Sequence, residues 1–407
     1  MTSGTESAIG PRILLANPSY LRLWTAGGLA NAMRFLEMLV AGVFTFEQTG
    51  SAFSVATVAV ARTLPMFFCG ALAGVIAETV NRKTLLLGGL LVMTVNSAVL
   101  WMLAASGQIA TWHIAAAGLV AGVVWASEMA VRRRMVGEVV PAGHVGQAVA
   151  LDSVTSSSTR MIGPLLGGIT FEVFGLDGAY LLSTAVHIVA ALIVTGLVFG
   201  QQSRQLAFGR IPAEIAEGIE AVRSRPALLG VVAVTVVMNM FGFSYSALVA
   251  PIGLNEFHVS AVLVGLLAAA EPLGALVTGF AFAAGWLPMR GVRTLMTGSF
   301  LFLFGLIAMA LAPWYALAFV LLLVGGLGTA AFGSMQSTLV LTEAPVALRS
   351  RVMGIVTMCI GTGPLGVLLV GYLSDWLGAS RALLAMALVG VAGLLVAQLC
   401  WPREERR

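Results

Sequence analysis

Long apolar stretches separated by short polar turns run from one end of this chain to the other, and they constrain its fold more than any other feature. A helix needs about 20 consecutive apolar residues to cross the hydrocarbon core of a bilayer. The 407 residues are 59% hydrophobic and only 10% charged, which is too apolar for the single core of a soluble domain. We therefore predict an all-α integral membrane protein.

The apolar pattern predicts twelve membrane-spanning helices in two six-helix halves. Their expected ranges are 22–46, 53–77, 84–106, 111–131, 147–171, 177–199, 227–252, 259–284, 292–312, 314–341, 350–374 and 379–401. The first 20 residues lack the apolar core and small-residue cleavage site of a signal peptide. The expected domains are an N-terminal segment (1–21), a first bundle (22–199), a linker (200–226), a second bundle (227–401) and a tail (402–407).

Positive charges gather in alternate connections between the predicted spans. They are Arg12, Arg22, Arg82, Lys83, Arg132, Arg133, Arg134, Arg204, Arg210, Arg223, Arg225, Arg290, Arg293, Arg349, Arg351, Arg403, Arg406 and Arg407. The other connections hold mostly acidic residues, with Arg381 as their only cation. By the positive-inside rule we expect both termini to be cytoplasmic. This topology explains the net charge of +4 without a nucleic-acid partner.

The linker region 200–226 contains an amphipathic pattern. Ile211, Ile215, Ile219 and Val222 recur at helical spacing, with glutamates elsewhere on the wheel. We predict a helix lying on the cytoplasmic surface, although a simple tether between the halves is compatible with the same pattern.

Enzyme and metal-site signatures are missing from the sequence. The three cysteines lie scattered in apolar runs, so we expect packing residues, not a disulfide framework or a metal site. The sequence contains no HExxH, no GxSxG and no phosphate-binding GxxxxGK[ST] motif. We therefore expect neither an enzyme nor an ATPase, and no cofactor. A scaffold or sensor without transport stays open, but it would need soluble extensions or partners that the sequence does not show.

The two halves resemble each other at an offset of about 200 residues. The paired segments are Pro18 with Pro226, Ala61–Pro65 with Ala270–Leu273, Glu138–Pro141 with Glu343–Pro345, and Gly163–Gly168 with Gly363–Gly366. Parallel six-helix repeats are typical of alternating-access transporters, with the substrate site at the repeat interface.

The segment Gly74–Leu85, between the second and third spans, resembles the loop signature of the major facilitator superfamily. In that family an acid and an arginine form a lock on the outward-facing state, which implies a lock of Gly74, Glu78, Arg82 and Lys83 here. Glu78 replaces the usual aspartate, and Asn81 replaces a glycine. Because asparagine tolerates the left-handed conformation, we expect Asn81 to preserve the turn.

A glycine-proline pattern in the fifth span is similar to the antiporter motif of the same superfamily. Its residues, with their echo in the eleventh span, are Gly163, Pro164, Gly167, Gly168, Gly363 and Pro364. Glycine permits close helix contact and proline removes a backbone hydrogen bond, so we expect bend points there. Packing glycines of an ordinary membrane bundle are the alternative.

Three further segments, 17–24, 49–52 and 217–226, look like the enterobactin-exporter and macrolide-efflux branch of the superfamily. The resemblance covers nearly the whole chain. It implies a monomeric drug:proton antiporter in the bacterial inner membrane, with a small-molecule substrate, protons and membrane lipid as its partners.

Ionisable residues inside the predicted spans are candidates for function, because a bilayer tolerates them only when they are paired or wetted. Glu37, Glu271 and Asp152 are our candidates for proton coupling. A permanent pair of Glu37 with Arg34, one turn away, is an alternative interpretation, as is a pair of Asp152 with an arginine of the 132–134 triplet.

Other polar residues are candidates for the wall of a substrate cavity. They are Asn31, Arg34, Arg62, Arg160, Asn239 and Tyr245. Arg160 is alternatively a brace for its own span, and we interpret His187 as a packed, neutral histidine.

The sequence thus favours secondary active export of an amphiphilic, drug- or siderophore-like molecule in exchange for protons. A facilitator, an importer or a lysolipid-flipping transporter of the same fold remains an open alternative.

Overall fold

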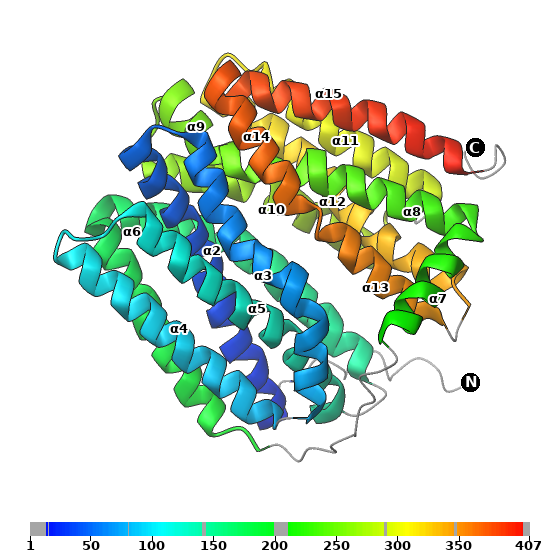
Figure 1. Ribbon diagram of the computed structural model, residues 1–407, viewed down its shortest axis with the longest axis horizontal. Helices are drawn as coiled ribbons and strands as arrows, with labels where there is room; N and C mark the ends of the chain where they lie inside the picture. The colour runs from blue at the N-terminus through cyan, green and yellow to red at the C-terminus, as the bar shows by residue number, and fades with distance from the viewer. Residues whose placement is uncertain are drawn as a thin grey trace. The chain divides into compact units, whose positions relative to one another are not determined.

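A computed structural model of the chain describes residues 14, 16–79, 81–140, 144–198, 211–288, 291–345 and 348–401. All regular structure in these ranges is helical (Figure 1). The first half contains α2 (Pro18–Thr49), α3 (Ala52–Thr79), α4 (Arg82–Ala105), α5 (Thr111–Val139) and α6 (Val145–Thr195). The second half contains α7 (Ile211–Arg223), α8 (Pro226–Val237), η3 (Met238–Gly242), η4 (Phe243–Leu248), α9 (Val249–Pro251), η5 (Ile252–Glu256), α10 (Ala261–Ala283), α11 (Val292–Ala310), α12 (Tyr315–Glu343), α13 (Arg349–Ile360), α14 (Gly363–Leu377), α15 (Ala379–Ala397) and η7 (Gln398–Cys400).

Ten helices in the described ranges are long and apolar enough to cross a membrane. One of them lies within α6, which runs for 51 residues but has non-helical geometry at Gly175, with φ of 71°. Gly163 packs against Ala32 and Phe35 of α2, whereas Ser183 hydrogen-bonds Glu37 on the next turn of α2. A straight helix would separate residues 163 and 183 by about 30 Å. The chain therefore reverses at Gly175, so α6 contains two antiparallel legs that correspond to the predicted spans 147–171 and 177–199.

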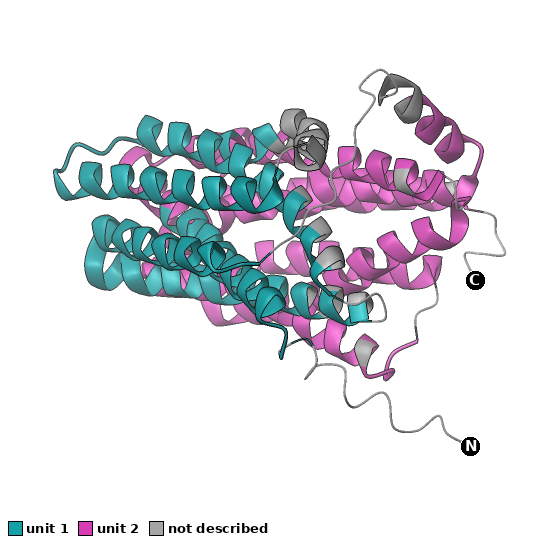
Figure 2. Cartoon of the chain, turned by 90° about the horizontal axis from the view of Figure 1, so that it is seen from below, with its two compact units in different colours: residues 1–40, 61–206 teal, residues 41–60, 207–407 magenta. Residues whose placement is uncertain are grey.

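The chain divides into two compact units, shown in different colours in Figure 2. Unit 1 comprises residues 1–40 and 61–206, and unit 2 comprises residues 41–60 and 207–407. The division after residue 206 lies inside the predicted linker. The twelve-span count and the cytoplasmic location of the termini stay predictions.

Residues 41–60 belong to unit 2 because Asp375, at the end of α14, caps the first turn of α3. Its Oδ1 accepts hydrogen bonds from the backbone N–H groups of Ala52 (2.8 Å) and Phe53 (3.3 Å), and its Oδ2 accepts one from the Ser51 hydroxyl (2.6 Å). Gly371 lies one turn before Asp375 and touches the backbone and side chains of α3, where a Cβ atom would meet Ala56. The cap and this close approach attach the α2–α3 turn to α14.

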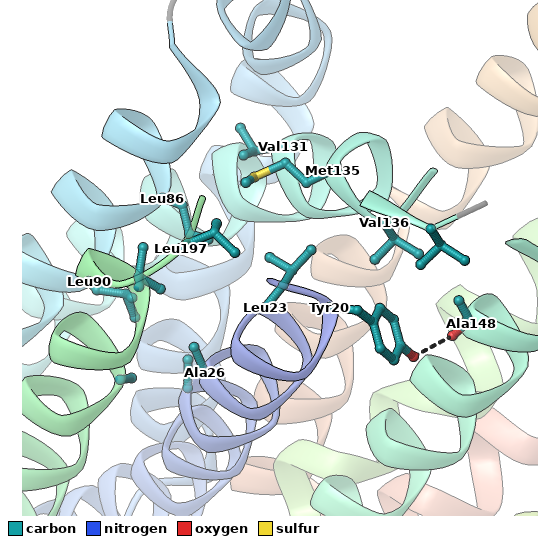
Figure 3. Close-up of a cluster of buried hydrophobic side chains, with 14 of the residues drawn as sticks. Tyr20, Leu23, Ala26, Leu86, Leu90, Val131, Met135, Val136, Ala148 and Leu197 are labelled. Atoms are coloured by element: carbon teal, nitrogen blue, oxygen red, sulfur yellow. Dashed lines mark hydrogen bonds between the residues drawn. The ribbon is translucent and has the colours of Figure 1, made fainter. Parts of the chain in front are cut away.

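A buried apolar cluster closes one end of unit 1 (Figure 3). It joins the first turns of α2, with Tyr20 and Leu23, to the last turns of α5, with Met135, and to Leu197 after α6. The Tyr20 hydroxyl donates a hydrogen bond of 3.4 Å to the carbonyl of Ala148, which draws the start of α6 into the cluster.

Glycine contacts determine how closely the helices of unit 2 approach. α11 lies beside α12 and α15 (Figure 1). A Cβ atom on Gly305 of α11 would come within 2.6 Å of the Cα atom of Gly325 on α12. Because neither residue has a side chain, the two backbones meet directly, as is common between membrane helices.

The described part of the linker forms the helix α7, which packs against α13. Gly218 lies against the backbone of Arg351, and the Arg351 guanidinium pairs with Glu217. Glu217 is exposed and Val222 of the predicted apolar face is buried, whereas Ile219 of the same face is 38% exposed, so the described residues agree with the predicted amphipathic pattern only in part. The side chains of Ile211 and Ile215 and all of residues 201–210 lie outside the described part of the chain.

Candidate functional site

Glu37 lies in the middle of α2 and is the centre of a buried polar cluster in unit 1. Its side chain is 3% exposed and pairs with Arg62 of α3 at 3.0 Å between Oε2 and Nη2. The hydroxyls of Ser97 on α4 and Ser183 on α6 donate to its other oxygen, Oε1, at 2.7 and 2.6 Å. Four helices thus contribute to one carboxylate, whose burial these charge-assisted hydrogen bonds offset.

Arg34 lies one turn before Glu37, but it pairs with Glu128 of α5 at 2.6 Å. Its guanidinium also stacks over the Trp125 ring, 4.8 Å from the centroid. Asn31 accepts a hydrogen bond from Arg34 and donates one to Thr159. The expected pair of Arg34 with Glu37 is therefore replaced by two pairs between helices, because each arginine reaches across to a neighbouring element.

Between these two ion pairs lies a small cavity with a volume of about 30 Å³. It is lined by both arginines, Glu128 and Trp125, with His187 of α6 and apolar side chains of α4. A cavity of this size has room for about two water molecules, and polar groups on its wall favour their presence. Of the three arginines predicted for a cavity wall in the first half, Arg34 and Arg62 line this space inside unit 1, whereas Arg160 does not.

Two other candidates of unit 1 lie on the first leg of α6. Asp152 forms an ion pair with Arg132 of α5, an arginine of the 132–134 triplet, as the alternative interpretation anticipated. Arg132 also covers Gly27 of α2, where a side chain would collide with it. Arg160 is half-buried one helical turn beyond Ser156.

Glu271 lies in α10 of unit 2 and is 1% exposed. The Thr329 hydroxyl of α12 donates to its Oε1 at 2.7 Å, and the Tyr245 hydroxyl lies 3.5 Å from its Oε2. A Cβ atom on Gly326 would collide with the Glu271 carbonyl, so α10 and α12 touch at this residue. Both of these contacts with Glu271 are made by neutral hydroxyl groups.

Asn239 and Tyr245 occupy a stretch where the helical geometry changes from α (α8) to π (η3) and then to 3₁₀ (η4). The Asn239 side chain donates to the Thr235 carbonyl at 2.9 Å, inside its own helix. Such local changes of helix type are frequent at functional sites of membrane and soluble helices. The Tyr245 hydroxyl thus contacts Glu271 on another helix, whereas the described hydrogen bond of the Asn239 side chain stays within its own helix.

The loop signature of residues 74–85 falls at the α3–α4 turn. Arg82 is 2% exposed at the start of α4, and Lys83 donates to the Thr195 carbonyl at 2.8 Å. Asn81 keeps the turn, but the expected left-handed conformation is wrong: its φ is −59°, and its side chain accepts from the Thr84 N–H as a helix N-cap. Gly74 lies within α3, and the side chain of Glu78 lies outside the described part of the chain.

The glycine-proline motifs make close helix contacts in each unit. In unit 1, Gly163 and Gly167 pack against the α2 backbone around Leu36, and Pro164 and Gly168 are buried beside them. In unit 2, α13 ends at Ile360 and α14 begins at Gly363 with Pro364 in its first turn, so the helix is interrupted at this motif.

Several residues of these sites were not singled out from the sequence. They are Ser97, Ser183, Trp125 and Thr329. Serine and threonine are ordinary residues of membrane helices, so their type alone carries little signal. Ser183 and His187 lie four residues apart, a spacing that places two polar groups on one face of an apolar helix.

A family model described as "transmembrane secretion effector" matches residues 9–406. The uncharacterised MFS-type transporter YfiS of Bacillus subtilis strain 168 is 23% identical over 384 residues, which is 88% of this chain and 87% of that protein. The multidrug efflux pump Tap of Mycolicibacterium fortuitum is 23% identical over 368 residues, with 87% and 89% covered.

Among solved structures, a bacterial homologue of the human lysosomal transporter Spinster, in an inward-facing and occupied conformation, matches with a TM-score of 0.74. The match covers 99% of both chains at 14% sequence identity, so it shows a shared fold.

Proposed function

Because this chain belongs to the major facilitator superfamily, and is therefore a transporter and not an enzyme, we propose that it exports an amphiphilic, drug- or siderophore-like molecule in exchange for protons. Transport proceeds by alternating access of the two six-helix bundles. The protein acts as a monomer in the bacterial cytoplasmic membrane, with both termini in the cytoplasm.

The observation that carries the proton coupling is the buried Glu37–Arg62 pair, 3.0 Å long and surrounded by the Ser97 and Ser183 hydroxyls. A proton on Glu37 removes the negative charge of this pair and leaves Arg62 without its counter-charge. Since an unpaired buried charge costs several kcal/mol, protonation favours rearrangement of the helices around it.

Support for export comes from similarity to a multidrug efflux pump over most of the chain. Glu271, with its hydroxyl donors in unit 2, is the second candidate for carrying a proton.

The test is transport by the full chain in proteoliposomes under an imposed pH gradient, with ethidium, erythromycin and a catechol siderophore as probes. We expect uphill movement of at least one probe in the parent protein, and its loss in Glu37→Gln or Glu271→Gln. Glu47→Gln is the matched control, because Glu47 lies on the same helix as Glu37 but is exposed. If the probes move at the same rate with and without the pH gradient, and in both variants as in the parent, the protein is a facilitator instead.

A further inference from the structure

His187 is a buried histidine that the proposed transport cycle does not yet use. It lies on the second leg of α6 and is 2% exposed. Its Nδ1 lies 2.9 Å from the carbonyl oxygen of Ser183. Because a carbonyl oxygen only accepts hydrogen bonds, Nδ1 carries the hydrogen, and Nε2 is the basic atom of the neutral ring.

The Ser183 hydroxyl connects this ring to Glu37. Its Oγ lies 2.6 Å from Glu37 Oε1 and 3.2 Å from His187 Nδ1. A hydroxyl both donates and accepts, so it can pass a proton on without keeping it. Glu37, Ser183 and His187 therefore form one continuous hydrogen-bonded chain inside unit 1.

His187 also lines the cavity of about 30 Å³ that Arg34, Arg62 and Glu128 line. These groups, with Glu37, are the charged side chains around the ring: α2 supplies Glu37 and Arg34, α3 supplies Arg62, and α5 supplies Glu128. The neighbouring turns of α4 contribute Leu90, Met93 and Ser97. The two arginines balance the charge of the two glutamates.

We propose that His187 and Ser183 form the proton path between the cavity and Glu37, an inference that rests on proton coupling through Glu37. A hydronium ion in the cavity gives a proton to Nε2 and becomes water, and the ring becomes an imidazolium. The Nδ1 proton then moves to Ser183 Oγ while the hydroxyl proton moves to Glu37. One proton has entered at Nε2 and one has arrived on the carboxylate. The reverse transfers release it and restore the first tautomer.

Ser97 provides the matched control, because its hydroxyl donates to the same Glu37 oxygen as that of Ser183 at nearly the same distance. Both serines are fully buried and both touch Glu37, but it is Ser183 that hydrogen-bonds His187. Ser183→Ala and Ser97→Ala thus each remove one hydroxyl donor from Glu37, together with the contact of 3.3 Å between the two hydroxyls. Ser183→Ala also removes the connection to the histidine.

The experiment is a pH jump, between about pH 9 and about pH 5, on the full chain in lipid nanodiscs, followed by infrared difference spectroscopy. A carboxylic C=O band that Glu37→Gln removes reports the proton on Glu37. We expect Ser183→Ala and His187→Gln to slow the appearance of this band by about tenfold or more relative to Ser97→Ala, which also loses a hydroxyl donor to Glu37 but keeps the path.

Equal rates in Ser183→Ala and Ser97→Ala would overturn the path, even if His187→Gln fails to fold. The absence of any Glu37 band would overturn both the path and proton coupling through Glu37. If the band behaves as expected but gradient-driven ethidium export is indifferent to Glu37→Gln, the path stands and the proposed antiport fails.

Discussion

Glu37 and Glu271 are both buried in apolar helices, but the contacts that the structure describes for each of them within its own unit differ. Unit 1 uses a charge pair, with Arg62 at 3.0 Å from Glu37. In unit 2 a neutral hydroxyl, that of Thr329, donates to Glu271 at 2.7 Å. Charge pairs between helices recur in unit 1, where Arg34 pairs with Glu128.

The difference is instructive because Arg62 and Glu271 occupy matching segments of the two halves, Ala61–Pro65 and Ala270–Leu273. In each unit a glycine packs against the carbonyl of this residue: Gly122 of α5 against Arg62, and Gly326 of α12 against Glu271. The close backbone contact is thus shared, whereas the side-chain charge is opposite. Packing geometry tolerates little change, but a buried charge needs only a suitable partner within reach.

The largest effect is expected from Arg62→Met, which leaves Glu37 buried without its positive partner. We expect the free energy of unfolding to fall by about 3–5 kcal/mol, measured by thermal unfolding in detergent. The double variant Arg62→Met/Glu37→Gln removes both charges and should recover much of that loss. A double variant no more stable than Arg62→Met would show that the pair is not what stabilises this region.

Gly122→Ala and Gly326→Ala test the shared part of the comparison. A Cβ atom at either position would collide with the carbonyl of the facing residue, so we expect each to cost about 1–3 kcal/mol, to a similar extent in the two units. Gly333→Ala, on the same helix as Gly326, is the control, since open space surrounds that position and alanine favours the helix. A large loss in one unit alone would contradict the equivalence of the two contacts.

Thr329→Val sharpens the contrast between the two carboxyl groups. It removes a single neutral donor to Glu271, and we expect a loss of about 1–2 kcal/mol in the same unfolding measurement. The loss should be clearly smaller than that of Arg62→Met. Equal losses would mean that the two carboxyl groups depend equally on their described partners, and the distinction between charge pairing and hydroxyl donation would fail.

The smallest effect concerns the ends of the helices, where carboxylates act as caps in unit 2. Asp375→Ala should lower the free energy of unfolding by about 1 kcal/mol. It should also speed hydrogen exchange at the amides of Ala52 and Phe53, because both donate hydrogen bonds to the Asp375 carboxylate. Glu256→Ala is the control, because the Glu256 carboxylate accepts a hydrogen bond from the Ser380 amide of α15. In that variant hydrogen exchange should become faster at Ser380 and stay unchanged at Ala52 and Phe53. Unchanged exchange at Ala52 in Asp375→Ala would show that the cap does not hold residues 41–60.

Much of the fold follows from the sequence, because each helix in a bilayer satisfies its own backbone hydrogen bonds. Each membrane-spanning helix can therefore be recognised from its apolar stretch alone. The turn at Gly175 is an example, because the pattern predicts separate spans at 147–171 and 177–199. The structure agrees that the chain reverses between them, as the contacts of Gly163 and Ser183 with the same helix, α2, make evident.

The sequence by itself determined the membrane-spanning class, the family and the identity of the buried ionisable residues. The tertiary structure alone decided their partners. Arg34 is one turn from Glu37, yet it reaches Glu128, while Glu37 pairs with Arg62, 25 residues away. Spacing along a helix fixes which residues share a face, but the packing of helices decides which neighbour that face meets, and in an apolar interior the nearest opposite charge across that contact determines the pairing.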